Sequence, residues 1–229
     1  MKNDYLCIIP ARGGSTSVKN KNLKLINNKP LIAFTIKAAI NSKKFSDIIV
    51  SSDSKKILDY SKKFKIQLHK RSKKNSKNNS TTHDAVKEII NSNLLNFKNK
   101  NIVILQPTSP FRKAKHIKES IKIFEKNYKA DCLVSVQKCP HNMIPESLMR
   151  KSKNFVQFNQ KNLLFRKQDK PNYFARNGAA IYITKYNRIQ NYILGGKILY
   201  YEMNKIDSID IDDYEDLEIS RIIAKKINL

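Results

Sequence analysis

The chain has 229 residues, 40% of them hydrophobic, and a formal net charge of +26. That hydrophobic content is enough for a folded core and excludes wholesale disorder. No apolar run approaches the roughly 20 residues of a membrane-spanning helix, so we expect no membrane partner. The apolar run at residues 6–11 makes a poor signal peptide, because Arg12 and two glycines follow it. The three cysteines, Cys7, Cys132 and Cys139, show no CxxC spacing and are expected to be reduced thiols of a cytoplasmic protein.

The positive charge has two interpretations. An excess of lysine and arginine attracts polyanions such as nucleic acid. Alternatively, the charge reflects drift in composition, since lysine, asparagine and isoleucine have AT-rich codons and are frequent throughout this sequence. The basic residues are scattered and form no stripe with interleaved aromatic residues. We therefore favour drift and expect no specific nucleic-acid partner.

Short apolar runs alternate with helical patterns along most of the chain. Strands are predicted at residues 5–9, 47–52, 65–68, 101–105, 131–136, 178–184 and 197–201. Helices are predicted at residues 31–40, 54–64, 82–97, 113–126 and 213–226. Such alternation is typical of an α/β protein with a mostly parallel, doubly wound sheet, in which ligands bind at the carboxyl ends of the strands.

Residues 138–173 depart from this alternation. Prolines interrupt the segment, and only residues 154–158 show weak alternation of polar and apolar side chains. We interpret it as an arm inserted into a single domain that spans residues 1–229. Its apolar side chains have no obvious place in the sheet core, so we expect the chain to form a homodimer through the arm. They are Met143, Ile144, Leu148, Phe155 and Phe158.

The loop after the first strand combines glycines with cations. Gly13 and Gly14 let backbone amides approach a ligand, and Arg12, Lys19 and Lys21 add positive charge. Converging amides and cations are what a polyphosphate needs. The loop is neither a P-loop nor a GxGxxG motif, and an ordinary solvated basic loop is the alternative interpretation.

Two carboxylates alternate with isoleucines near the C-terminus. In an extended segment, Asp210 and Asp212 face the same way while Ile209 and Ile211 turn inward. Paired carboxylates suit a hard divalent cation. The alternative is a solvated acidic turn before a helix, which the helix dipole favours. The other nearby acids are interpreted as helix-start residues rather than metal ligands: Asp207, Asp213, Glu215 and Asp216.

Five segments together resemble the CMP-sialate synthetases, the cytidylyltransferases that activate N-acetylneuraminate and related nonulosonic acids. They read IPARGGS followed by KNKNL, SSDS, LQPTSP, NGAAIY and DSIDID, and they span almost the whole chain. The resemblance implies a Rossmann-like fold and a homodimer with an arm from each subunit. It also implies Mg²⁺-dependent transfer of CMP from CTP to the anomeric hydroxyl of the sugar acid, with Mn²⁺ as an alternative cation.

The resemblance assigns roles to individual residues. Lys21, Arg12 and Asp212 are the expected catalytic residues, and Asp210 and Asp212 are the expected metal ligands. The expected nucleotide-binding residues are Ala11, Arg12, Gly13, Gly14, Ser15, Lys19, Lys21, Asn22, Arg71 and Thr82. The expected substrate-binding residues are Gln106, Thr108, Ser109, Arg166, Lys167 and Asn177. A rigid proline turn is the alternative interpretation of the LQPTSP segment.

The sequence departs from the family at two positions. Thr16 stands where the family has a lysine that contacts the phosphates of CTP, and Lys19 is the natural substitute. Lys167 stands where the arm motif has an arginine. Because lysine cannot form a bidentate fork with a carboxylate, Arg166 or Arg176 would have to replace it. The four histidines show no metal spacing and are expected at surface or helix positions. Another sugar nucleotidyltransferase, or a catalytically weakened homologue that binds nucleotide or polyanion, stays an alternative.

Overall fold

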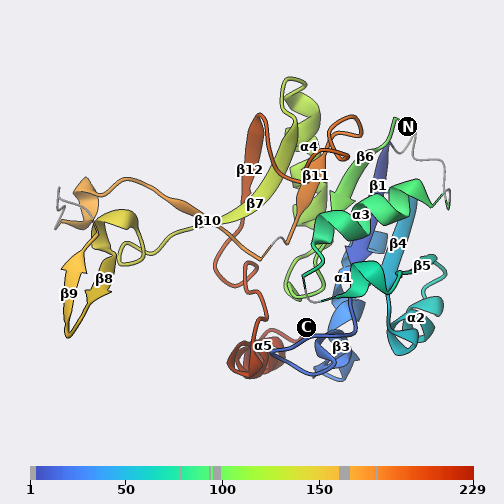
Figure 1. Ribbon diagram of the computed structural model, residues 1–229, viewed down its shortest axis with the longest axis horizontal. Helices are drawn as coiled ribbons and strands as arrows, with labels where there is room; N and C mark the ends of the chain where they lie inside the picture. The colour runs from blue at the N-terminus through green and yellow to red at the C-terminus, as the bar shows by residue number, and fades with distance from the viewer. Residues whose placement is uncertain (1–3, 78, 93, 95–98, 160–165, 179) are drawn as a thin grey trace.

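The computed structural model describes residues 4–77, 79–92, 94, 99–159, 166–178 and 180–229 (Figure 1). Eight strands form the central sheet, in the order β10-β7-β11-β6-β1-β4-β5, with β12 also paired to β7. They are β1 (Tyr5–Pro10), β4 (Asp47–Ser52), β5 (Gln67–Lys70), β6 (Asn101–Ile104), β7 (Cys132–Lys138), β10 (Phe174–Arg176), β11 (Tyr182–Thr184) and β12 (Ile198–Glu202). The helices are α1 (Leu31–Ser42), α2 (Lys55–Lys62), α3 (Thr82–Asn91), α4 (Ala114–Lys126) and α5 (Tyr214–Lys226).

The sheet is mainly parallel, as predicted. β1 runs parallel to β4 and β6, β4 to β5, and β12 to β7. β10 and β11 run antiparallel to β7, and β11 is also antiparallel to β6. The reason is the arm, because it returns the chain along β7 in the reverse direction. β10 pairs with the C-terminal part of β7 and β11 with its N-terminal part, so the returning chain is interrupted between them.

Alternate residues of β1 are buried on opposite faces of the sheet. Cys7 and Ile9 belong to a core shared with α1, α2 and α4, whereas Leu6 and Ile8 belong to a core shared with α3. A third cluster packs α5 against the hairpin of β2 (Leu25–Ile26) and β3 (Lys29–Pro30) and includes Phe111. Helices on both faces explain why the strands read as continuous apolar runs, and they confirm the doubly wound fold.

Several predicted boundaries differ from the structure. β5 begins two residues later than predicted, and α3 ends at Asn91, well before the predicted residue 97. Residues 93 and 95–98 of that predicted helix lie outside the described residues. The strand predicted from residue 178 begins only at Tyr182, because the interruption after β10 occupies the residues between.

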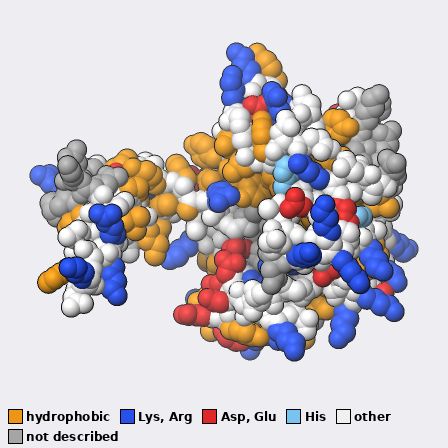
Figure 2. Space-filling view, viewed as in Figure 1, with side chains coloured by type: hydrophobic (Ala, Val, Ile, Leu, Met, Phe, Trp, Pro, Cys, Tyr) orange, Lys and Arg blue, Asp and Glu red, His pale blue; other side chains and the backbone are white. Residues whose placement is uncertain are grey.

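The arm projects from the body of the molecule (Figure 1). It carries a hairpin of β8 (Met149–Ser152) and β9 (Phe155–Phe158), where the sequence shows only weak alternation. Hydrophobic side chains gather along the arm and at its junction with the body (Figure 2). Phe155 is 74% exposed, so most of its side chain is not covered by the described residues. Ile144 is an exception to the expectation, because it is buried at the base of the arm.

None of the helices in the described part of the chain is long and apolar enough to cross a lipid bilayer. All three cysteines are free, as expected of reduced thiols. Cys7 and Cys132 are buried in β1 and β7, whereas Cys139 is half-buried at the base of the arm.

Candidate active site

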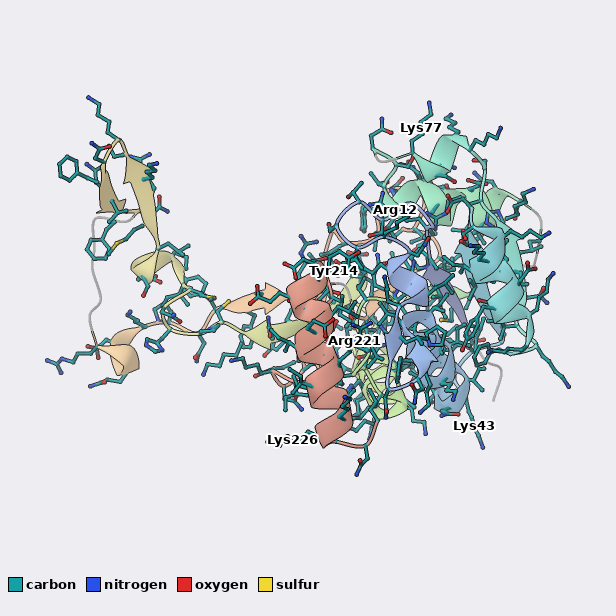
Figure 3. The ribbon with its side chains drawn as sticks, turned by 90° about the horizontal axis from the view of Figure 1, so that it is seen from below. Arg12, Lys43, Lys77, Tyr214, Arg221 and Lys226 are labelled. Atoms are coloured by element: carbon teal, nitrogen blue, oxygen red, sulfur yellow. The ribbon has the colours of Figure 1, made fainter. Side chains whose placement is uncertain are left out.

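The loops that follow β1, β4 and β6 meet the segment before α5 at the carboxyl edge of the sheet. The amide of Ala11 donates to the carbonyl of Ser51 (2.9 Å), and the amide of Ile211 donates to the carbonyl of Thr108 (2.9 Å). Figure 3 shows Arg12 and the first residue of α5, Tyr214, towards one end of the molecule, with Lys43 and Lys226 towards the other. The fold therefore brings four of the resembling segments together, and Gly178 of the fifth lies against Asp210.

The glycine loop is held in place by residues that follow β4 and by Asn22. The amide of Gly13 donates to Asp53 (2.7 Å), and a Cβ at Gly13 would lie only 2.7 Å from the Cβ of Ser54. The side chain of Asn22 is buried and donates to the carbonyl of Arg12 (2.9 Å). Asn22 thus supports the loop. The backbone of Gly14 borders open space, which leaves room for a phosphate there.

Lys21 joins the glycine loop to the acidic segment. Its Nζ donates to the carbonyl oxygens of Ile211 (2.7 Å) and Asp212 (2.8 Å) and lies 3.8 Å from the Asp212 carboxylate. The Lys21 side chain is 11% exposed, whereas that of Asp212 is 81% exposed. Two of the three predicted catalytic residues are therefore neighbours, although 191 positions separate them.

Asp210 occupies a confined position beside them. Its Oδ1 is buried and has no hydrogen-bond partner among the described residues. Burial raises the pKa of Asp210 to about 6, and the charge of Asp212 adds to this rise, whereas a hydrogen bond from Thr108 and the charge of Lys21 oppose it. The backbone of Gly178 covers the carboxylate, since a Cβ there would lie 1.9 Å from Asp210 Cγ.

These carboxylates fit a hard divalent cation. A buried carboxylate oxygen without a partner costs free energy, and a cation would remove that cost. Among the described residues, no three His, Cys, Asp or Glu side chains are placed to hold one metal ion, so water or substrate oxygens would have to complete the coordination. Ile211 is buried as predicted, but Ile209 is only half-buried.

The loop after β6 is held by its backbone. The carbonyl of Gln106 accepts from Thr35 (3.3 Å) and Arg112 (2.9 Å), while the Gln106 amide donates to Thr82 (3.2 Å). This contact brings two predicted site residues together. Ser109 is buried, and its hydroxyl has no partner among the described residues. Its predicted contact with substrate stays a prediction.

Arg112 is a residue that the sequence interpretation missed. It is fully buried and donates to the carbonyls of Gln106 (2.9 Å) and Ala180 (2.8 Å) as well as to the hydroxyl of Thr35. Burial lowers the pKa of Arg112 to about 10, while the nearby charge of Asp210 opposes this effect. Arg112 thus ties the loop after β6 to the interruption between β10 and β11. In the sequence, Arg112 simply follows a proline turn, and nothing there distinguishes a buried arginine from an exposed one.

Asn177 is buried and already uses its amide inside the protein. It accepts from Ser135 (2.7 Å) and donates to Ser208 (3.1 Å) and to the sulfur of Met203 (3.3 Å). These bonds hold the Gly178 backbone beside the segment that carries Asp210. The structure therefore gives Asn177 a positioning role, and direct contact with substrate stays a prediction.

Arg71 lies at the ends of β4 and β5. It is buried and donates to the carbonyl (3.2 Å) and hydroxyl (3.4 Å) of Ser51. The Ser51 hydroxyl also lies 3.1 Å from Nδ1 of His69. His69 is buried within β5, so the expectation of a surface or helix position was wrong for this histidine. Burial lowers the pKa of both His69 and Arg71.

Asp207 is not a helix-start acid. It is buried, with Lys113 Nζ at 3.2 Å and His116 Nε2 at 3.3 Å from its carboxylate. Burial lowers the pKa of His116, although the charge of Asp207 opposes this shift. These contacts fasten the segment before α5 to α4. Asp213 and Asp216, by contrast, cap α5 as expected.

Within a single copy of the chain, the described arm residues do not reach this site. Arg166 lies 3.8 Å from Asp169 in an exposed ion pair on the arm, which projects away from the sheet (Figure 1). The side chain of Lys167 lies outside the described residues. Arg176, at the end of β10, lies instead beside a cavity of about 1040 Å³ that Asp210 and Asp212 also line.

Comparison with known proteins places this arrangement in context. The N-acylneuraminate cytidylyltransferase of Escherichia coli O18:K1:H7 is 29% identical over 231 residues, which cover 100% of this chain and 54% of the relative. The enzyme of that name from Oncorhynchus mykiss is 32% identical over 216 residues, covering 92% of this chain and 48% of the relative. The chain thus spans about half the length of these curated relatives.

Solved structures share the fold. A CMP:2-keto-3-deoxy-manno-octonic acid synthetase complexed with CTP superposes with a TM-score of 0.72 at 15% identity, covering 97% of this chain and 99% of that one. A 4-diphosphocytidyl-2C-methyl-D-erythritol synthase from Anaerococcus prevotii superposes with a TM-score of 0.65 at 11% identity, covering 96% and 98%. The family model described as cytidylyltransferase matches residues 6–226. The chain belongs to the cytidylyltransferase family.

Proposed function

We propose that the chain transfers CMP from CTP to the anomeric hydroxyl of a nonulosonic acid and releases pyrophosphate. The contact between Lys21 and the Asp212 segment carries the proposal. It unites a loop suited to polyphosphate with a carboxylate pair suited to a divalent cation. The similarity to N-acylneuraminate cytidylyltransferases over nearly the whole chain supports a sugar acid as the acceptor.

In the proposed reaction, the anomeric oxygen of the sugar acid attacks the α-phosphorus of CTP. The bond between that phosphorus and the bridging oxygen to the β-phosphate breaks, pyrophosphate leaves, and the hydroxyl proton passes to solvent. Arg12, Lys21 and the amides near Gly14 bind the phosphates. Arg71, which Ser51 fixes at the ends of β4 and β5, would contact the base.

Asp210 and Asp212 would hold Mg²⁺, or alternatively Mn²⁺, which when bound neutralises charge on the phosphates. Asp210 must be ionised to do so. Lys21 and Thr108 favour the ionised form, because each lowers the pKa of Asp210 against the effect of burial. Lys21 therefore serves both the phosphate loop and the carboxylates.

We further propose that residues 1–229 form one domain with an inserted dimerisation arm, and that two copies associate through residues 138–173. Phe155, Val156 and Phe158 on the arm hairpin are exposed. At the junction with the body, the rings of Phe174 and Tyr200 are in contact, tilted by 30° with centroids 5.2 Å apart, and both side chains are exposed. We place the protein in the cytoplasm, where its free cysteines would stay reduced.

The test is pyrophosphate release by the purified chain with CTP, Mg²⁺ and a panel of nonulosonic acids. We expect release that requires all three components, and a much lower rate with UTP, GTP or ATP. Asp212→Asn should lose most of the activity, whereas Asp59→Asn, an exposed change on α2, should retain it. Release with another nucleotide and another sugar would favour the alternative of a related nucleotidyltransferase.

A further inference from the structure

A cavity of about 1040 Å³ lies beside the carboxylate pair. Asp210, Gly178 and Asp212 form part of its lining, but no residue of the glycine loop does. The cavity therefore adjoins the proposed phosphate site without being that site. Its volume is at about the upper limit of the range of ligand-binding clefts.

One wall of this cavity is polar and cationic. Arg176 donates a hydrogen bond to the hydroxyl of Tyr182 (3.3 Å), and among the described residues no carboxylate pairs with its guanidinium. Gln137, whose backbone pairs with that of Ala175 next to Arg176, also lines this wall. Lys205 adds a second cation. An arginine that is held at one nitrogen and otherwise unpaired is suited to a carboxylate ligand.

A second part of the lining, the isoleucine wall, is apolar. Four isoleucines form it: Ile206 and Ile209 from the segment before α5, and Ile219 and Ile223 from α5 itself. Ile219 and Ile223 are four positions apart and share one face of the helix. Ile206 and Ile219 are exposed, whereas Ile209 and Ile223 pack on the cluster beneath α5. The cavity thus presents a cationic wall and an apolar wall to the same ligand.

We infer that this cavity binds the sugar acid, that Arg176 binds its carboxylate, and that the isoleucine wall selects sugar acids with additional apolar groups. Such groups are acylated amines or a methyl end in place of hydroxyls. The inference rests on the proposed function and names the substrate class of that site. Hydroxyls placed against the isoleucines would lose hydrogen bonds to water, whereas methyl groups would gain contact.

Arg176 would also account for the lysine at position 167. A carboxylate that binds a bidentate arginine within the same chain does not require an arginine from the arm. Three carboxylates also line the cavity, those of Asp210, Asp212 and Asp216. Charge complementarity therefore favours the carboxylate of a ligand beside Arg176 and Lys205, away from these acids.

The experiment compares two sugar acids in the pyrophosphate assay. N-acetylneuraminate carries a hydroxylated tail, and legionaminate carries a second acetamido group and a methyl end. We expect kcat/KM to be about tenfold or more higher for legionaminate, within the range by which one apolar group is discriminated in a pocket. Ile219→Asn should remove most of that preference. Ile222→Asn changes an exposed isoleucine of α5 that does not line the cavity and should leave the preference intact.

Arg176→Gln tests the carboxylate contact. It should raise KM for every sugar acid by about tenfold or more while leaving KM for CTP unchanged, and Arg176→Lys should restore part of the loss. Arg188→Gln alters an arginine outside the cavity, where it pairs with Asp131 (2.9 Å), and should change neither KM.

Equal kcat/KM for both sugars, with Ile219→Asn and Arg176→Gln silent, would overturn the inference while CMP transfer stands. A fall from dimer to monomer in Ile219→Asn with an unchanged sugar preference would show that the apolar wall is a subunit contact, and would also overturn it. Absence of pyrophosphate release with any sugar acid would instead contradict the proposed function itself.

Discussion

The backbone of Gly178 lies against the carboxylate of Asp210 so closely that no larger residue fits there. A Cβ would lie 1.9 Å from Cγ and 2.0 Å from Oδ2 of Asp210, and Gly178 has φ of +60°. Only glycine adopts this conformation readily. The glycine of the NGAAIY segment thus fixes the position of a carboxylate that is 32 residues later in the chain.

Gly178→Ala should therefore displace Asp210 and lower turnover about a hundredfold or more, in a pyrophosphate assay with CTP and Mg²⁺. The matched control is Gly196→Ala. Gly196 also has positive φ (+64°), and its Cβ would lie 2.4 Å from an oxygen of Asp131, away from the site. Both variants should lose stability, but only Gly178→Ala should lose activity at a temperature where both are folded. Equal activities would disprove the proposed role of Asp210.

Asp210→Asn should stabilise the fold at pH 8 while it abolishes Mg²⁺-dependent turnover. Burial raises the pKa of Asp210 to about 6, above its value in the unfolded chain. The stabilisation from the protonated form is present at low pH and is lost as the pH rises through about 6. The amide cannot ionise, so the variant keeps that stabilisation, on the order of 2 kcal/mol.

Thermal unfolding with a chelator present checks this prediction. The Tm of Asp210→Asn should exceed that of the unsubstituted chain by an amount that grows from pH 5 to pH 8. A lower Tm for the variant at pH 8 would show that the fold stabilises the ionised carboxylate. That result would contradict the prediction that burial destabilises the ionised form of Asp210.

Lys19 should compensate for the neutral residue at position 16. Both Thr16 and Lys19 are exposed on the glycine loop, as a phosphate-binding pair requires. We expect Lys19→Ala to lower CTP turnover about tenfold, since a charge-assisted contact to phosphate contributes roughly 1.5–3 kcal/mol. Thr16→Lys alone should change turnover within about threefold but should rescue Lys19→Ala. If Lys19→Ala has no effect while Thr16→Lys raises turnover strongly, the two residues do not share one phosphate.

The arm should hold two copies together. Sedimentation at micromolar concentration should show a dimer, and Phe155→Ser combined with Phe158→Ser should shift it to monomer by exchanging apolar contact for polar surface. Tyr128→Ser, at a side chain that is 77% exposed on the body, should leave the dimer intact. A monomer before any substitution would contradict the dimerisation role of residues 138–173.

The sequence predicted best the strands that are buried on both faces, because their apolar runs can be recognised without knowing which element covers them. β4 matches its predicted bounds, and β1 differs by one residue, because both faces of these strands are covered by helices and nearly all their side chains are apolar or small, Asp47 being the exception. The N-cap at Asp213 was also predictable, since a capping residue acts within its own helix turn. Local rules were sufficient for these features.

The sequence did not predict features that depend on contacts between distant segments. The interruption between β10 and β11 exists because two parts of the returning chain pair with different parts of β7. Asp207 reads as a helix-start acid until Lys113 and His116 of another element are placed beside it. Arg112 acquires its role only when the carbonyls of Gln106 and Ala180 converge on it.

The most direct test of CMP transfer is the pyrophosphate released from CTP by the chain and its Lys21→Met variant, with and without a nonulosonic acid. Lys21→Met keeps an unbranched side chain but removes the charge that binds the Asp212 segment and that we propose to bind the phosphates. We predict sugar-dependent release by the unsubstituted chain and at least a hundredfold loss in the variant. Pyrophosphate release that does not depend on the sugar acid, or that is unchanged in Lys21→Met, would contradict the proposed CMP transfer.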